Sequence, residues 1–500
     1  MKKTDIFLAI SVALYSFLFY HQSLGLNFLL FSVLQIVFFY LSYKQNTKAP
    51  MWRLSAMGVL ASSVAILLYG STLGFVANII SLGALAFCSV APGTSLIMGL
   101  FHNLYSVFGS SVFVVFDLVN SAEARKEKSS KRMRNFIMFS IAFVVMLLFF
   151  ALYRSANVAF KNITDKIDLS FISGPWVGFT FVGFLIIYGL YKYRSIPQFE
   201  KFDIESKNDL TPSDKPNSLD RLIPIDNEKK TGILLFVMLN VLLLFVNTVD
   251  VFFLFGDGEL PEGLNHSDIV HQGINALITS IIMAVGIILF FFRGRLNFIR
   301  QNKLLKNLSY IWIAQNAFII LSTAYRNHMY VSDYLLTYKR IGVYVYLGLS
   351  IIGLVYTFLK IKNTKSNWYI VRYVGWNFFA VLIVSPLIDW NKIIVNYNLS
   401  HAEDKIENVD FSYLVHLSPK TLPIVYSGMK NIDESLLNEF SNEIERKARR
   451  YLKNQERYDW RSYNLSDSEA IKELTNLFPN IKLENLESNN YKQSREEDVY

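Results

Sequence analysis

The chain has 500 residues, of which 52% are hydrophobic and only 18% are charged, and its formal net charge is +9. In soluble domains about a quarter of the residues are charged, so this chain has fewer charged residues than usual. Its mean hydropathy of +0.30 is also high. This composition excludes an ordinary cytosolic enzyme and argues against a disordered or fibrous protein, so we expect a chain embedded in a membrane.

Apolar runs that approach the roughly 20 residues needed to cross a bilayer core of about 30 Å recur along most of the chain. They lie at 5–21, 25–43, 54–70, 73–91, 95–119, 135–153, 174–191, 231–255, 269–292, 307–325, 340–359 and 369–388. We expect about 11 full spans and one interrupted segment, placed near Ala91-Pro92-Gly93 because Pro and Gly break helices; twelve full spans is the alternative. The predicted fold is therefore an all-α polytopic transmembrane helical bundle with a small C-terminal helical extramembrane domain.

Polar segments between the runs suggest how the chain is organised. We expect N-terminal transmembrane helices at 1–120, a basic cytoplasmic loop at 121–134, transmembrane helices at 135–192, a cytoplasmic polar loop at 193–230, C-terminal transmembrane helices at 231–395, a small helical extramembrane domain at 396–486 and a disordered tail at 487–500.

The charges of the loops predict the orientation, because Lys and Arg accumulate on the cytoplasmic side. The basic clusters that begin at Arg125 and at Arg293 are therefore expected inside. In the second half, alternation then sends the segment after Asn391 to the periplasm or cell exterior. In the first half, Lys2 and Lys3 favour an inside N-terminus, but five spans before Arg125 would place its cluster outside. The N-terminal orientation stays open.

The C-terminal segment differs from the rest in charge and pattern. From Asn398 it carries 14 Lys and Arg against 19 Asp and Glu, a net of −5, so the preceding part carries +14. This excess fits loops facing anionic lipid rather than nucleic acid. Ser418-Pro419 predicts a helix start, and Ser466 with Glu469 has capping-box spacing. One apolar face is expected over Leu436, Leu437, Phe440, Ile444 and Ala448.

Sequence signatures of catalysis or metal binding are lacking. The single cysteine, Cys88, permits no intramolecular disulfide and no Cys-rich zinc site. His266 and His271 are five residues apart, about 140° around a helix, so one helix cannot aim both at one ion. No Walker, Rossmann, G-x-S-x-G or H-E-x-x-H pattern occurs. We therefore predict no cofactor, no metal and no assigned catalytic residue.

Polar residues inside the spans are costly and mark packing or function. Asn240, Asn247 and Asp250 lie within about 80° of arc on one helix and are expected to point inward as a stripe. Alternation places further charged side chains at the same outer level as Asp250. Cations exceed carboxylates there, which suits an anionic group held by Arg. The alternative is an ion-pair network that only locks helices together.

Several motifs resemble a family of bacterial multi-pass membrane proteins classed only as a domain of unknown function. They include Tyr153-Arg154-Ser155-Ala156-Asn157, Asn247-Thr248-Val249-Asp250, Ser322-Thr323-Ala324-Tyr325-Arg326, Tyr338-Lys339-Arg340-Ile341-Gly342 and Asp389-Trp390-Asn391. The resemblance covers roughly residues 150–425, and it implies a bacterial cytoplasmic-membrane protein without established catalytic residues or substrate. Its motifs coincide with the outer polar residues.

The candidate binding residues form an outer polar ring: Arg154, Asn157, Asn247, Asp250, His271, Tyr325, Arg326, Lys339, Arg340 and Asp389. The leading hypothesis is a non-enzymatic transporter-like or sensor-like protein with an outward-facing polar pocket that binds a small anionic solute or a lipid headgroup. One alternative is an intramembrane transferase or hydrolase acting on a lipid-linked substrate, with Asp250 or His271 as general base. The other is an assembly scaffold that recruits partners through its C-terminal domain. The lipid bilayer is the expected partner, and nucleic acid is not.

Overall fold

The computed structural model describes residues 3–123, 173–212, 224–255, 266–299, 301–402 and 406–481, together with isolated positions between 138 and 157. In residues 118–123, 253–255 and 266–278 it describes the backbone but not the side chains. Across these residues the chain is helical and contains no β-strand, which confirms the predicted all-α class. Described residues of 1–203, 383–387 and 455–468 form a first compact unit, and those of 204–382, 388–454 and 469–500 form a second.

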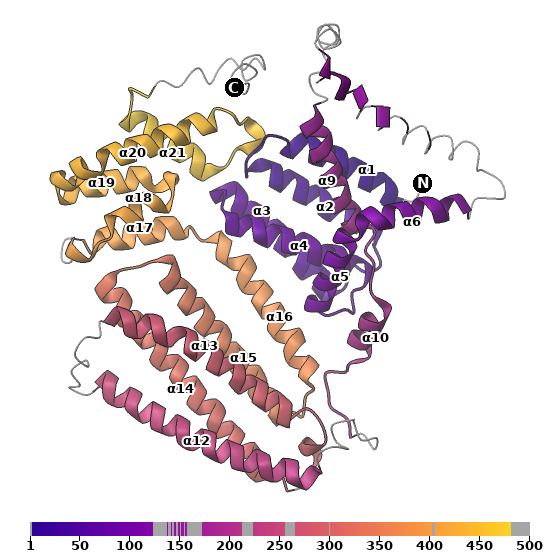
Figure 1. Cartoon of the computed structure of the whole chain (residues 1–500), viewed down its shortest axis with the longest axis vertical. Helices are drawn as coiled ribbons and strands as arrows, with labels where there is room; N and C mark the ends of the chain where they lie inside the picture. Colours follow the sequence, from indigo (N-terminus) through magenta and orange to yellow (C-terminus); the bar gives the residue numbers. More distant parts are fainter. Residues whose placement is uncertain are drawn as a thin grey trace. The chain divides into compact units, whose positions relative to one another are not determined.

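The first unit is built from helices that follow the predicted apolar runs (Figure 1). They are α1 (Lys3–Phe19), α2 (Leu26–Ser42), α3 (Pro50–Tyr69), α4 (Thr72–Val90), α5 (Leu96–Phe108), α6 (Ser110–Glu123) and α9 (Gly174–Tyr191). Helix α10 (Pro197–Glu205) lies instead within the predicted polar loop 193–230, and most of its residues belong to this unit. Helix α1 packs against α2 and α9, α3 packs against α2 and α4, and α5 packs against α4 and α9.

Buried polar side chains join these helices in pairs and triads. Tyr191 Oη donates to Gln35 Oε1 at 2.8 Å, and Gln35 Nε2 donates to Ser11 Oγ at 3.0 Å, so α9, α2 and α1 share one closed triad. Asn78 of α4 donates to Ser32 of α2 and to Ser62 of α3 at 3.0 and 3.1 Å. Because these groups are buried among apolar helices, satisfied networks of this kind specify which helices pair.

Helices α5 and α9 approach closely at Gly189. A Cβ atom at Gly189 would lie 2.5 Å from the Cα atom of Val107, whereas a Cβ atom at Gly178 of the same helix would meet nothing within 4 Å. Because the obstacle is backbone, it cannot rotate away. We expect Gly189→Ala to lower the free energy of unfolding by about 1–3 kcal/mol, and Gly178→Ala to leave it nearly unchanged, as measured by thermal unfolding in detergent. Equal effects of the two substitutions would contradict this close contact.

The second unit begins with a bundle of four helices (Figure 1). They are α12 (Ile225–Phe255), α13 (His266–Phe291), α14 (Lys303–Tyr334) and α15 (Tyr338–Lys362). Phe236, Trp312 and Leu354 belong to their shared core. The outward face of α12 exposes large apolar side chains, including Met238, 62% exposed, and Phe245, 68% exposed. Exposed apolar surface of this extent marks a contact with a membrane or with another protein.

The remaining helices of the chain are shorter. They are α16 (Asn367–Val384), α17 (Trp390–Ser400), α18 (Phe411–Leu417), α19 (Leu422–Ile432), α20 (Glu434–Gln455) and α21 (Leu465–Leu477), with 3₁₀ turns at Arg295–Phe298, Ser385–Leu387, Ile406–Asn408, Pro419–Thr421 and Trp460–Ser462.

A separate core joins α17 to α21 and confirms the amphipathic pattern predicted there. Leu437, Ile444 and Ala448 of α20 are buried in this core, and the sequence-predicted face therefore points inward. Ser418 caps the turn that begins at Pro419, as expected.

One predicted cap is wrong. Helix α21 begins at Leu465, and Asn464 Oδ1 accepts from the main-chain nitrogen of Asp467 at 2.9 Å. Asn464 therefore takes the cap that the spacing assigned to Ser466, because its amide oxygen reaches the third helical residue.

Seven helices in the described part of the chain are long and apolar enough to cross a membrane, and eight if a bent helix pair counts as one span. This supports a multi-pass membrane protein. Helices α1 and α2 have 17 residues each, at the lower limit of a span. Most of the predicted run 135–153 lies outside the described residues, as do residues 124–134 of the predicted basic loop 121–134 and the tail 487–500.

The interrupted segment is broken at Gly109 and not near Ala91-Pro92-Gly93, where the sequence predicted the break. The chain leaves helix at Ala91, since α4 ends at Val90, but this is a turn between separate helices. The bent pair is α5 with the start of α6, and its bend of 69° lies at Gly109. There a Cβ atom would lie 2.4 Å from the Phe113 ring and 2.9 Å from the Tyr105 carbonyl oxygen, so a larger residue would require these neighbours to shift.

Candidate functional site

The polar stripe of α12 faces α14; periodicity predicts its shared inward face but not the partner helix. Asn240 Nδ2 donates to the main-chain carbonyls of Phe236 at 2.6 Å and Leu308 at 3.0 Å, and Asn240 Oδ1 accepts from Gln315 Nε2 at 2.7 Å. Two turns along, Asn247 Nδ2 contacts the main-chain carbonyl of Gln315 at 3.4 Å. Asn240 and Asn247 are only 9% and 8% exposed.

The two helices run parallel with a seven-residue repeat. Asn240 contacts the main-chain carbonyl of Leu308, and Asn247 contacts that of Gln315. The interval between the two contacts is seven residues on α12 and seven residues on α14. Buried Asn residues at such spacing fix the register of paired helices. The stripe therefore has at least one structural role, which is to align α12 with α14.

An ion pair lies at the end of this stripe. Arg326 Nη2 contacts Asp250 Oδ1, and Ser322 Oγ donates to Asp250 Oδ2 at 2.7 Å. The Asp250 side chain is 15% exposed and that of Arg326 is 28% exposed. Both oxygens of the carboxylate thus have a donor, because a charge in an apolar helix pair needs compensation. Of the predicted ring, these two residues meet directly, and Asn247 lies one turn away on α12.

Arg340 has a different contact from the rest of the ring. Its Nη1 donates to the main-chain carbonyls of Tyr334 and Leu335, and its guanidinium lies 4.1 Å from the centroid of the Tyr330 ring. Leu335 has φ 65° and ψ −173°, a conformation that residues other than glycine rarely adopt and that costs about 1–3 kcal/mol. These contacts stabilise the turn between α14 and α15, so the guanidinium of Arg340 acts as a C-terminal helix cap.

The other ring residues are spread over the chain. Lys339 is exposed at the start of α15, and Tyr325 is 45% exposed. Asp389 caps α17 by accepting from the main-chain nitrogen of Lys392 at 3.1 Å. Arg154 and Asn157 belong to the first unit. The side chain of His271 is not among those that the structure describes.

Charges outside the spans are also partnered. The side chain and main-chain nitrogen of Arg461 donate hydrogen bonds to Asp459, which lower the pKa of that carboxyl although burial opposes the shift. In α20, Arg449 pairs with Glu445 at 2.8 Å. Burial lowers the pKa of Lys447, whose Nζ donates to the Val415 carbonyl at 2.5 Å. Part of the basic run on α20 therefore stabilises local packing.

No group of three or more His, Cys, Asp or Glu side chains that could hold a metal occurs in the residues whose side chains are described. The side chains of His266, Asp268 and His271 fall outside them.

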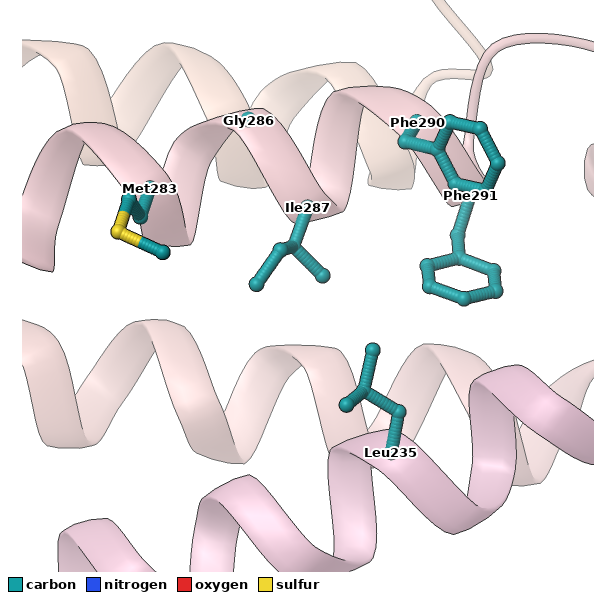
Figure 2. A pocket seen from close by; sticks show the side chains of 6 residues that line it. All are labelled: Leu235, Met283, Gly286, Ile287, Phe290 and Phe291. Carbon is teal, nitrogen blue, oxygen red and sulfur yellow. The ribbon is translucent and has the colours of Figure 1, made fainter.

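A hollow lies elsewhere in the same bundle, between α12 and α13. It has a volume of about 400 Å³, and Figure 2 shows Leu235 facing Met283, Ile287 and Phe291 across it. All of its side chains are apolar, so it suits hydrocarbon and cannot recognise a charged group.

The sequence reasoning missed a buried cluster in the first unit around His102. His102 is 0% exposed, its Nδ1 lies 3.2 Å from Tyr193 Oη, and Glu200 and Asp203 act on it electrostatically. Asp203, also 0% exposed, accepts from the main-chain nitrogen of Ser95 at 2.6 Å. These residues lie about a hundred positions apart in sequence, and no local motif joins them, so only folding brings them together.

Comparisons with known proteins place the chain in a family. No curated protein and no solved structure matches it. The model of a domain of unknown function, DUF4153, matches residues 6–428. The match therefore includes the first 130 residues, which the motif resemblance did not cover. Because it spans most of the 500 residues and both compact units, the chain belongs to the DUF4153 family, a family of unknown function.

Proposed function

We propose that this chain is a multi-pass protein of a bacterial cytoplasmic membrane, with its N-terminus inside and its C-terminal helices outside. The main-chain nitrogen of Leu26, the first residue of α2, donates to the Tyr463 carbonyl at 2.8 Å, and Ser462 Oγ donates to Oε1 of Gln22 in the α1–α2 turn at 2.8 Å. The α1–α2 turn and residues 455–468 are therefore on one side of the membrane. With the C-terminal segment outside, α1 runs outward and Lys2 lies inside, as the positive-inside rule prefers.

The bent pair α5–α6 supports the same orientation. It begins where Ser95 contacts Asp203, and both Ser106 near the end of α5 and Asp117 of α6 contact Arg194, just beyond α9. Because the segment begins beside α10, and both its bend and α6 contact Arg194, which precedes α10 in the same predicted loop, we infer that it enters and leaves on one side of the membrane. Four crossings, α1 to α4, then precede the basic cluster at Arg125 and leave it inside. The proposed orientation is then consistent with the loop charges of both halves of the chain.

Reporter fusions test this orientation. We expect alkaline phosphatase to be active when fused after Gly70 or Tyr500 and inactive after Asn120, and green fluorescent protein to fluoresce only after Asn120. Phosphatase activity after Asn120 would show that α5 and α6 cross the membrane and would contradict the proposed orientation.

The function that the geometry supports best is recognition of a phosphate-type anion at Arg326, in a transporter-like or sensor-like protein. The observation that carries it is the incomplete pairing of Arg326. A guanidinium has five N–H donors, and the described residues provide a partner, Asp250, for one of its nitrogens. Its side chain is 28% exposed. A partly exposed arginine with free donors at a span end suits bidentate binding of phosphate oxygens.

Neighbouring charges favour an anion at the same level. Asn327 Nδ2 donates to the Arg340 carbonyl at 3.2 Å, so the start of α15, with exposed Lys339, lies beside the residue that follows Arg326. Asp389 serves as the cap of α17. The partly exposed Arg326 and the exposed Lys339 can therefore both attract an anion, while Asp333 near the end of α14 carries a compensating charge.

Thermal unfolding of the full-length protein in neutral detergent tests this function. We expect short-chain phosphatidylglycerol or inorganic phosphate to raise the Tm, and phosphatidylcholine to have little effect, because a ligand bound only to the folded state stabilises it. Arg326→Gln should remove the shift, whereas Lys303→Gln, at the opposite end of α14, should retain it. A response to phosphatidylglycerol alone identifies a lipid headgroup, and a response to phosphate identifies a solute. The same shift in Arg326→Gln would refute the site.

A further inference from the structure

The hollow between α12 and α13 runs along the axis of α13. Its lining residues on α13 follow one another at intervals of three or four positions and therefore share one helix face. They are Met283, Gly286, Ile287, Phe290 and Phe291, and they extend over about 12 Å of the helix. Leu235 of α12 lies on the opposite side (Figure 2). Because transmembrane helices tilt only about 20° from the bilayer normal, such a hollow accepts a hydrocarbon chain that lies along the helix.

The hollow is open to the outside of the bundle. Met283 and Phe290, which lie at its two ends on α13, are 61% and 42% exposed. A Cβ atom at Gly286 would meet nothing within 4 Å, so the absence of a side chain there leaves space on the lining face. In a membrane-spanning bundle the surroundings at this depth are lipid tails. An acyl chain is therefore the group that can enter the hollow.

A cation lies at one end of the hollow. The guanidinium of Arg293 is 4.3 Å from the centroid of the Phe290 ring, which lines the hollow. Arg293 Nη1 donates to the Phe290 carbonyl and contacts Glu228 Oε1, both at 2.6 Å. Among the described residues, Nε and Nη2 of Arg293 have no partner, and its side chain is 20% exposed. Two adjacent guanidinium nitrogens of this kind bind two oxygens of a phosphate group.

The chain segments that meet at this end are basic. Helix α12 contacts the 3₁₀ turn that follows α13, and residues 225–230 and 293–306 together carry seven Lys and Arg against two Asp and Glu. One of these acids, Glu228, is already paired with Arg293, and Arg295 in the turn is exposed. Basic pockets at the cytoplasmic ends of transmembrane helices attract anionic headgroups. Charge therefore selects among the lipids whose chains fit the hollow.

We propose that this end of the α12–α13 pair binds a phospholipid with an anionic headgroup, such as phosphatidylglycerol. One acyl chain lies in the hollow along α13, and the phosphate binds Nε and Nη2 of Arg293. The site goes beyond the proposed anion site at Arg326, because Glu228 and Asp250 are separated by about 33 Å along α12. Only its assignment to the cytoplasmic leaflet, which has the more negative surface, rests on the proposed orientation.

Native mass spectrometry of the purified full-length protein in neutral detergent tests this site, because it counts the lipids bound to each protein molecule. Phosphatidylglycerol and phosphatidylcholine with the same long acyl chains are titrated separately. We expect phosphatidylglycerol to bind at least about 5-fold more tightly, since each nearby cation favours an anionic lipid. The short-chain lipid of the unfolding experiment at Arg326 offers few methylene groups to the hollow and gains little there.

Two variants remove the two halves of the site. Gly286→Leu should weaken phosphatidylglycerol binding at least about 10-fold, because its side chain displaces methylene groups of the acyl chain. Gly348→Leu on α15 is the matched control: its Cβ atom also meets nothing within 4 Å, but Gly348 does not line the hollow, so the affinity should not change. Arg293→Gln combined with Glu228→Gln leaves no carboxylate unpaired. It should weaken binding at least about 5-fold, because the phosphate loses its charged donors.

The outcomes separate this site from the one at Arg326. Loss of a bound phosphatidylglycerol in Gly286→Leu but not in Arg326→Gln supports the inference, whether or not the proposed function holds. Loss in Arg326→Gln alone places the lipid at Arg326 and overturns the inference. Equal affinities of the native protein for the two lipids, or equal binding by Gly286→Leu and Gly348→Leu, would also overturn it. If Gly286→Leu does not fold, Leu235→Phe fills the hollow from the opposite side and gives the same comparison.

Discussion

Arg326→Ala is expected to lower the free energy of unfolding by about 2–4 kcal/mol, because it leaves the Asp250 carboxylate in an apolar helix pair without its cation. Asp250→Ala should have a similar effect, since Arg326 and Ser322 then lose their acceptor. Unfolding in mixed micelles measures both. The double variant Asp250→Ala with Arg326→Ala should cost less than the sum of the two single changes, because no unpaired charge remains.

This double-mutant cycle also separates packing from function. A coupling energy above about 1 kcal/mol indicates direct interaction, and additive effects would contradict the ion pair. The double variant should be folded and inserted, yet show no Tm response to phosphatidylglycerol or phosphate. If it is stable and still responds, the pair only locks α12 to α14, which was the alternative reading of the polar ring.

Lys360→Ala is expected to be the most destabilising single change at the other end of the bundle, by about 3–5 kcal/mol. Lys360 is 0% exposed, and its Nζ donates to the main-chain carbonyls of Phe292 at 2.6 Å and Lys365 at 3.0 Å. It therefore joins the end of α13 to the turn after α15. Alanine removes both hydrogen bonds and leaves a cavity where the side chain packs. Thermal or mixed-micelle unfolding measures the loss.

Two further variants identify the cause. Lys360→Met keeps the aliphatic volume, so the loss of about 1–3 kcal/mol that remains reports the unpaired carbonyls. Lys362→Ala, an exposed lysine two residues later, should stay within about 0.5 kcal/mol of the native protein. A Lys360→Met protein more stable than the native one would show that burial of the ammonium costs more than its two hydrogen bonds return.

Both predictions concern contacts that span many residues of sequence. The periodicity of α12 correctly indicates that Asn240, Asn247 and Asp250 share one buried face. It does not indicate that Arg326 and Ser322 would be the partners of Asp250, since they lie 76 and 72 residues further along. Positive charges at several outer helix ends satisfy the same pattern. The choice among them depends on which helices pack together.

The same limit explains the first half of the chain. Hydropathy predicts one run at 95–119. It depends only on side-chain polarity and not on the direction of the backbone, so it cannot predict the bend at Gly109. His102 similarly forms no sequence motif with the residues near it in space, because Tyr193 and Asp203 belong to much later segments of the chain. The cap at Asn464 instead of Ser466 shows that spacing alone leaves element ends uncertain by a residue or two.

The sequence by itself determined the membrane class, the all-α fold, the positions of the apolar helices and the buried face of α12. These follow from local hydropathy and from a period of 3.6 residues, which every helix carries in its own sequence. Only the tertiary structure decided that Asp250 pairs with Arg326, that Arg340 caps the turn after α14, and that Glu228 pairs with Arg293. Those features depend on register between helices, and register is set by packing across segments that are distant in the chain.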